Sequence, residues 1–212
     1  MTSPRTTRKA RSCGLVLAIA SFRWLFLILG MSALGYCAYA IVTAHNFQAG
    51  ERQQFESRTL PLSPEMPFSG QPVLYAGGSV IGELEIPRLQ VKDVFIEGVT
   101  AGDLRKAVGH IPGTAFPWQN GNVVLSGHRD TFFRPLRNIR AGDLIVLHTM
   151  YGSYRYRVLF TQIVKPTDVQ VLAPHTYRGL TLTTCYPFYY VGPAPDRFIV
   201  VAALENPLNS RA

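Results

Sequence analysis

Cys185 stands where a nucleophile would be expected. The stretch 180–185 alternates apolar and polar side chains and is rich in β-branched residues, which predicts a strand. Pro187 has no backbone N–H to donate and is expected to end that strand. A thiol at the end of a rigid strand, beside a loop, can act as a nucleophile. The competing interpretation is a small buried apolar residue, the usual role of a free cysteine.

His128 is the best candidate for a catalytic imidazole. A cysteine reacts as the thiolate, and a nearby histidine is the usual means of forming it. His128 follows the apolar segment 123–125 and Gly127, so it is predicted at a strand end, as Cys185 is. The other histidines of the folded part are interpreted as ordinary surface or core side chains: His110, His148 and His175.

Arg197 is the candidate donor for a negatively charged intermediate. Acyl transfer needs a hydrogen-bond donor for the oxyanion that forms at the attacked carbonyl. Arg197 begins the strand that follows the Cys185 strand, and consecutive strands are usually neighbours. A solvated arginine beside a strand would look the same in the sequence, and Arg129 and Arg134 are competing candidates for the role.

The elements that must position these side chains are short strands separated by glycine- and proline-rich turns. Little helix is expected beyond 100–107, where Thr100 and Asp103 have the spacing of a capping box, and a helical turn within 131–138. This pattern predicts an all-β domain, either a barrel or a sandwich. The expected strands are 81–86, 91–98, 122–126, 143–149, 153–164, 180–185 and 197–204.

The N-terminal part has the features of a membrane anchor. Trp24–Ala44 contains no charged residue and is long enough to cross about 30 Å of hydrocarbon as a helix. Several basic residues precede it and no acidic residue occurs before Glu51, which predicts a cytoplasmic N-terminus. A cleaved signal peptide is the alternative. The predicted organisation is a basic N-terminus at 1–23, a membrane helix at 24–44, a proline-containing stalk at 45–78 and a folded domain at 79–212.

Cysteine usage and charge narrow the function classes. Of the 3 cysteines, Cys13 and Cys37 lie in or beside the anchor, so a disulfide framework with Cys185 is not expected. The formal net charge is +8, but part of it precedes the membrane segment. The rest shows no basic stripe with interleaved aromatic residues, which argues against nucleic-acid binding. No His/Cys/Asp cluster has metal-ligand spacing, so no metal site is predicted.

Three motifs together resemble the sortase family, and most closely its class D. They are Leu-Ser-Gly-His-Arg-Asp around His128, Thr-Leu-Thr-Thr-Cys-Tyr-Pro-Phe around Cys185, and Arg-Phe-Ile-Val from Arg197. The resemblance covers about 82–204. It implies a closed eight-stranded β-barrel with one or two short helices, behind a single membrane helix. It also implies a cysteine transpeptidase with Cys185 as nucleophile, His128 as acid and base, and Arg197 as oxyanion donor.

The resemblance implies partners as well. The substrate would be a Leu-Pro-x-Thr-Gly-like sorting signal of secreted proteins, cleaved outside the cytoplasm through a thioacyl intermediate and passed to an amine acceptor. Thr184 would hold the substrate or the oxyanion, and an apolar groove would include Val169, Val171 and Leu172. No cofactor is expected; some members bind calcium, for which no ligands are assigned here. One alternative is a cysteine hydrolase or a peptidoglycan-directed cysteine transpeptidase. The alternative from another class is a membrane-tethered β-barrel that binds peptide or carboxylate ligands without catalysis.

Overall fold

The computed structural model describes residues 7–58, 75–173, 177–190 and 192–205. The start of the basic N-terminus, the centre of the predicted stalk and His175 lie outside these residues. The chain divides between Thr43 and Ala44 into two units, each described here by itself.

The described residues of the first unit are all helical. Helix α1, Thr7–Arg58, includes the whole uncharged run and continues into residues that the sequence assigned to the stalk. Its stretch Phe22–Gly50 is long and apolar enough to cross a membrane by length and composition. Large apolar side chains such as Phe26, Leu34 and Ile41 are exposed all around this stretch, as lipid-facing residues would be.

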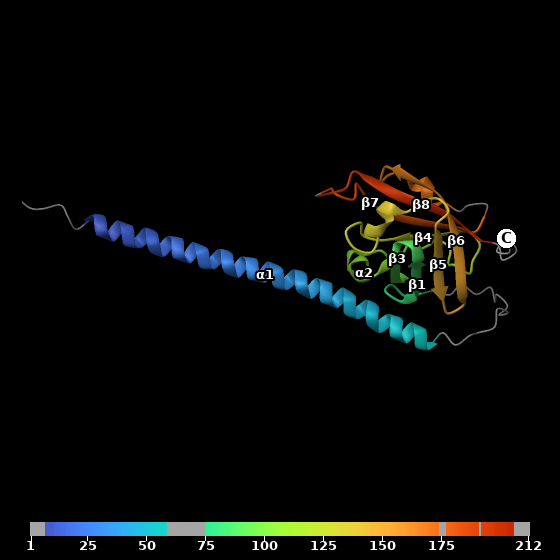
Figure 1. The fold of residues 1–212 in the computed structure, drawn as a ribbon, viewed down its shortest axis with the longest axis horizontal. Coiled ribbons are helices and arrows are strands. Elements are labelled where there is room, and N and C mark those ends of the chain that lie inside the picture. Colours follow the sequence, from blue (N-terminus) through green and yellow to red (C-terminus); the bar gives the residue numbers. More distant parts are fainter. Residues whose placement is uncertain (1–6, 59–74, 174–176, 191, 206–212) are drawn as a thin grey trace, which may run out of the picture. The chain divides into compact units, whose positions relative to one another are not determined.

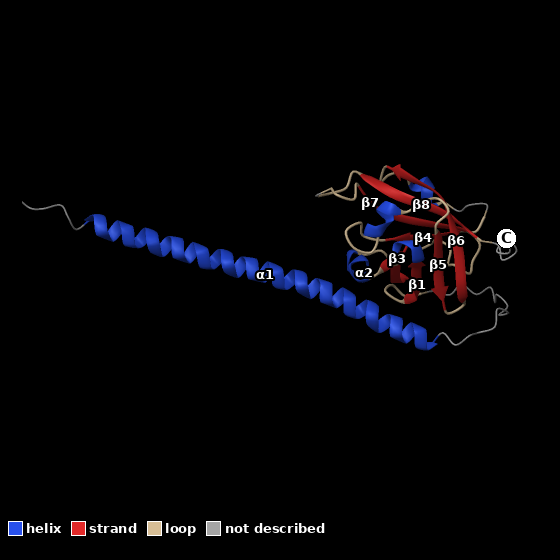
Figure 2. Ribbon diagram, in the orientation of Figure 1, coloured by secondary structure: helices blue, strands red, loops and turns tan. Residues whose placement is uncertain are grey.

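The second unit is built around a closed β-barrel of eight strands, as the resemblance implied and one of the two architectures that strand patterning left open. Figure 1 labels most of its strands, and Figure 2 shows how little of this unit is helical. Neighbouring strands around the barrel follow the order β1-β2-β3-β4-β7-β8-β6-β5. Their bounds are β1 Val80–Ile86, β2 Val91–Glu97, β3 Val108–His110, β4 Asn122–Ser126, β5 Leu144–Thr149, β6 Gly152–Val164, β7 Gly179–Tyr186 and β8 Asp196–Leu204.

Short helical segments connect these strands. Helix α2, Ala101–Lys106, begins at a complete capping box between Thr100 and Asp103, as the sequence predicted. Three single-turn 3₁₀ segments are η1 Pro87–Leu89, η2 Arg134–Asn138 and η3 Val169–Leu172. η2 is the helical turn expected within 131–138, and η3 lies in the connection before the Cys185 strand.

Two strand pairings place the candidate residues. β7 and β8 run antiparallel in a register that sets Cys185 directly opposite Arg197, and Figure 1 shows these strands side by side. β4 pairs with β7 in parallel, with Ser126 beside Thr183, so the segment after β4 begins at the same end of the barrel. The carboxyl ends of β4 and β7 and the amino end of β8 therefore meet at one rim.

The core beneath this rim is dense. Leu180 and Leu182 of β7 are fully buried in the main apolar cluster. On the opposite face of the same strand Thr181 is also fully buried, and its hydroxyl donates to Asn122 Oδ1 at 3.0 Å. A strand buried on both faces and paired on both edges is a rigid support for Cys185 at its end.

Phe47 and Gln48, which the sequence assigned to the stalk, pack within this second unit. Gln48 is 7% exposed; its Nε2 donates to the Lys106 carbonyl at 2.8 Å, and its Oε1 accepts from the Val94 N–H at 2.7 Å. Phe47 packs against the small apolar cluster that contains Val94. The side-chain amide therefore bridges β2 and the end of α2 in the place of a backbone pair.

Candidate active site

A cavity of about 300 Å³ opens at the rim where β4, β7 and β8 meet. It is lined by all three residues that the sequence proposed for catalysis, His128, Cys185 and Arg197. It is also lined by the four residues proposed for substrate binding: Thr184, Val169, Val171 and Leu172. The structure thus brings together on one surface residues that are up to 69 positions apart, because Arg197 and His128 belong to strand ends that the barrel topology joins.

Cys185 lies at the end of its strand and outside the buried core. It lies one residue before the end of β7, is partly exposed, and has no disulfide partner. Residues earlier in the same strand, such as Leu182, are fully buried. The exposed thiol at the end of a buried strand fits the nucleophilic interpretation better than that of a small core residue.

His128 is held by the backbone of the turn that carries it. The Gly127 N–H donates to the Thr183 carbonyl at 3.2 Å, and the Phe133 N–H donates to the His128 carbonyl at 3.1 Å. Glycine is required at 127 because a Cβ there would lie 2.8 Å from a ring atom of the fully buried Phe133. The turn is therefore fixed on two sides before the imidazole makes any contact of its own.

The Thr184 hydroxyl has a partner other than the one expected. Thr184 is 2% exposed, and its Oγ1 donates to the Gly127 carbonyl at 2.6 Å. This short hydrogen bond links Thr184, which precedes Cys185, to Gly127, which precedes His128. The hydroxyl therefore supports the His128 turn. The expected contact of Thr184 with the substrate or the oxyanion stays a prediction.

Arg197 directs part of its guanidinium to nearby backbone. Its Nη1 donates to the Asp196 carbonyl at 3.0 Å and contacts the Ala194 carbonyl at 3.5 Å. Both acceptors belong to the segment that leads into β8, so this segment helps to orient the side chain. Lys165 and Asp168 also line the cavity and add one charge of each sign to its wall. Lys165 lies near Arg197, since its Nζ donates to Asp196 Oδ1 at 2.7 Å.

Comparison with known proteins agrees with this geometry. A family model described as Sortase domain matches residues 84–205, more than half of the chain. The chain belongs to the sortase family. It is 44% identical over 124 residues to Sortase D of Bacillus subtilis (strain 168), in an alignment that covers 58% of this chain and 63% of that protein. The resemblance inferred from the three motifs is confirmed.

Two further relatives support the same assignment. Sortase SrtE1 of Streptomyces coelicolor is 32% identical over 135 residues, which is 55% of this chain and 38% of that protein. The solved structure of a Clostridium perfringens Sortase D5 transpeptidase has a TM-score of 0.64 and 25% identity, covering 78% of this chain and 99% of that one. The alignments span less than two thirds of the length of both curated relatives.

The competing arginine and histidine candidates are placed differently. Arg129 is 7% exposed and donates to three loop carbonyls, so its guanidinium does not face the cavity as an oxyanion donor would. His110 is fully buried, with Nδ1 2.6 Å from Glu97 Oε2. His148 bonds to Glu85 and Ser153 on the barrel surface. The interpretation of these two histidines as ordinary core and surface side chains agrees with their positions.

Several residues of the cavity wall were not foreseen. Among them are Leu104 of α2 and Ile111, directly after β3. No strand was predicted beside Ile111, because the three-residue strand β3 is too short to show alternation. Gly109 in β3 is a sequence signal that this segment lies close to another backbone segment, because a Cβ there would lie 2.3 Å from the Gly98 carbonyl oxygen.

Other potential sites in this sortase contain no catalytic candidate. Within the described residues, no group of three or more His, Cys, Asp or Glu side chains could hold a metal ion. A larger cavity of about 490 Å³, lined in part by Arg88, Arg137 and Arg140, includes none of the three proposed catalytic residues. The chemistry that the sequence predicts belongs to the rim cavity.

Proposed function

We propose that this chain is a membrane-anchored cysteine transpeptidase that cleaves a Leu-Pro-x-Thr-Gly-like sorting signal and transfers the acyl part to an amine. One observation carries the proposal. Cys185 lies opposite Arg197 in adjacent strands, and both line one cavity with His128. Membership of the sortase family and the similarity to proteins named Sortase D support the same activity.

Acylation begins when the imidazole of His128 takes the proton of the Cys185 thiol. The thiolate sulfur attacks the threonine carbonyl carbon of the sorting signal, and the carbonyl oxygen becomes an oxyanion that Arg197 stabilises by donating hydrogen bonds. The C–N bond to the next residue then breaks. His128 gives its proton to the leaving amine, and a thioester joins Cys185 to the substrate.

Deacylation reverses these roles with a second amine. His128 removes a proton from the acceptor amine as its nitrogen attacks the thioester carbonyl. The C–S bond breaks, the Cys185 thiolate leaves, and an amide bond to the acceptor forms. The apolar wall formed by Val169, Val171 and Leu172 binds the leucine and proline of the signal, because removing these side chains from water is favourable.

The test is intact-mass spectrometry of the protein with sorting-signal peptides of varied sequence. Wild type is expected to gain the mass of the acyl fragment on Cys185, and Cys185→Ala should gain none. Cys37→Ser is the matched control, because it removes an exposed thiol of α1 that has no proposed role. His128→Ala should acylate about 10²–10⁴-fold more slowly, the usual contribution of a positioned acid–base group.

The alternatives give different results in the same experiment. A binding module without catalysis would bind peptide with Cys185 blocked by alkylation and would never form the adduct. A cysteine hydrolase would form the adduct but release a free carboxylate even when millimolar amine is present. Either result would replace the transpeptidase assignment.

We also propose a single-pass topology with a cytoplasmic N-terminus and the barrel outside the cytoplasm. It is supported by the apolar stretch Phe22–Gly50 and by the basic residues before Trp24. The measurement is labelling of intact cells with a membrane-impermeant maleimide, in a Cys13→Ser, Cys37→Ser background. Labelling of Cys185 is expected, and its labelling only after lysis would reverse the topology.

A further inference from the structure

Arg129 is a buried arginine directly after the proposed acid–base residue His128. Its guanidinium is surrounded by backbone carbonyls of one loop: Nη1 donates to Pro187 at 3.0 Å, and Nη2 donates to Tyr190 at 2.7 Å and to Gly192 at 3.0 Å. The side chain is 8% exposed. A charged group this deep is retained only where its donors are satisfied. Here the hydrogen-bond partners of Nη1 and Nη2 are main-chain oxygens, and Nε lies 3.6 Å from Asp130 Oδ1.

The three acceptors all belong to the connection between β7 and β8. This connection, 187–195, joins the strand of Cys185 to the strand of Arg197. Pro187 lies at its start, and Gly192 lies past its middle, so a single guanidinium holds both parts. A planar group with donors in a fixed fork suits this task, since it constrains direction as well as distance.

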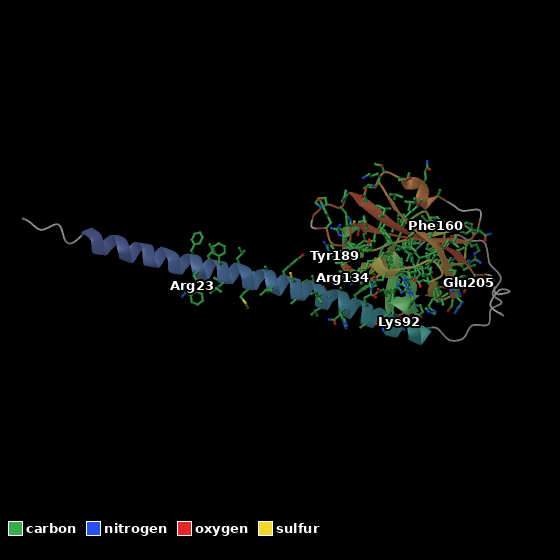
Figure 3. The ribbon with its side chains drawn as sticks, turned by 45° about the horizontal axis from the view of Figure 1, so that its top comes forward. Arg23, Lys92, Arg134, Phe160, Tyr189 and Glu205 are labelled. Atoms are coloured by element: carbon green, nitrogen blue, oxygen red, sulfur yellow. The ribbon has the colours of Figure 1, made fainter. Side chains whose placement is uncertain are left out.

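Aromatic contacts fasten the same loop to the same partner segment. The Arg129 guanidinium carbon lies 5.8 Å from the centroid of the Tyr190 ring, and that of Arg137 lies 5.5 Å from the Tyr189 ring. Tyr189 is 78% exposed and is labelled at the outer edge of the barrel domain in Figure 3. The loop is thus attached to the segment after His128 by the buried Arg129 and, at the exposed surface, by the contact of Arg137 with Tyr189.

The last part of the loop reaches Arg197. The Ala194 and Asp196 carbonyls both accept from Arg197 Nη1. Arg129, next to His128, thus contacts the first part of the loop, and Arg197 contacts its last part. His128 and Arg197, which must both face Cys185, are therefore connected through Arg129 and the loop as well as through the strands of the barrel.

We propose that Arg129 is a positioning residue that locks the β7–β8 loop to the His128 segment and thereby sets Arg197 against Cys185. The effect on turnover rests on the transpeptidase function proposed above, whereas the effect on the loop does not. Arg129 touches no substrate in this proposal, because its three carbonyl partners leave it facing away from the cavity. Its removal is expected to free the loop and misplace Arg197 without changing the apolar wall that binds the peptide.

The experiment compares Arg129→Met and Arg129→Lys with Arg137→Met. Methionine keeps most of the buried aliphatic stem and removes the guanidinium. Lysine keeps the positive charge but lacks the planar set of donors. Arg137→Met is the matched control, since it removes only the Tyr189 contact. Hydrogen exchange followed by mass spectrometry should show faster exchange in a peptide spanning 187–196 for Arg129→Met, with β1 and β5 unchanged, and little change for the control.

Steady-state peptide cleavage gives the second measurement. For Arg129→Met, kcat is expected to fall about 10–100-fold with KM nearly unchanged, since a misplacement near 1 Å can cost about 10²-fold in rate. The kcat of Arg129→Lys should lie between that of Arg129→Met and that of wild type. Arg129→Met combined with Arg197→Lys should lose less than the product of the two single losses, because both changes act on one contact network.

The outcomes separate the possible explanations. Unchanged loop exchange in Arg129→Met would overturn the proposal, as would a rise in KM alone or losses that multiply with Arg197→Lys. If Arg129→Met does not fold, Arg129→Lys decides by the same exchange and kcat criteria. If wild type forms no thioacyl adduct with any sorting-signal peptide, the proposed function fails, and the exchange result still supports or overturns the lock on the loop.

Discussion

Replacing Thr184 with valine would show whether its hydroxyl supports the fold of the site or binds substrate. Valine has nearly the same shape, so the change removes one hydroxyl and leaves the Gly127 carbonyl without the donor at 2.6 Å. Leaving a buried acceptor unsatisfied costs about 1–3 kcal/mol. Since 1 kcal/mol corresponds to about 2–4 °C in a domain of this size, Tm should fall by about 2–12 °C.

The loss of activity should follow the loss of support for the His128 turn. We expect kcat to fall in Thr184→Val while KM for a sorting-signal peptide stays close to wild type. Thr184→Ser keeps the hydroxyl and should recover most of both Tm and kcat. The assay is a thermal melt of each variant beside steady-state peptide cleavage. A Thr184→Val protein that melts like wild type but has a raised KM would refute this reasoning and restore the substrate-binding role.

Three further predictions concern other contacts. Arg197→Lys should reduce kcat nearly as much as Arg197→Ala, by about 10²–10³-fold, because lysine lacks the planar fork; full activity of the lysine variant in peptide cleavage would show that charge alone suffices. Hydrogen bonds from Arg88 hold the pKa of Asp143 below its ordinary value. The ionised Asp143 should therefore stabilise the protein above about pH 4, and this contribution should be lost as the pH falls through the lowered pKa. Thermal melts of wild type and Asp143→Asn should therefore converge in acid, and a constant difference would contradict this. Gln48→Ala should lower the free energy of unfolding by about 1–3 kcal/mol, because it leaves buried backbone groups unpaired. A protein that starts at Ser79 should also melt at a lower temperature than one that starts at Ala44. Equal melting temperatures would show that the Gln48 contact contributes nothing.

The strands that carry the site were predictable because alternation is a local signal. The segment before Cys185 alternates over six residues, and the hairpin of β5 and β6 lies within one residue of its predicted bounds. β3 was missed because three residues cannot show a period of two. The choice between barrel and sandwich depended on pairings such as β4 with β7, which no single stretch of sequence records.

The side chains that support the site were harder to predict than those that line it. His128, Cys185 and Arg197 could be proposed because a reaction requires their chemical types in combination. Their catalytic roles stay predictions, as do those of Val169 and its neighbours in the apolar wall. Arg129 looked like a competitor of Arg197, because its carbonyl partners depend on the path of a loop some sixty residues away in sequence. Gln48 gave no signal, since one amide in a polar stalk resembles any other.

The parallel pairing of β4 with β7 determines when the site can assemble during folding. The tight turn between β5 and β6 joins residues that are close in sequence. Gly127 and Thr184 are 57 residues apart, so we expect them to meet later, because closing a longer loop costs more chain entropy. In a partly folded chain, Cys185 is therefore expected to lack the imidazole of His128 beside it. Because the thiolate is the reactive form, such a thiol reacts slowly near neutral pH. We therefore expect Cys185, the proposed nucleophile, to meet its proposed acid–base partner His128 only when β4 and β7 have paired.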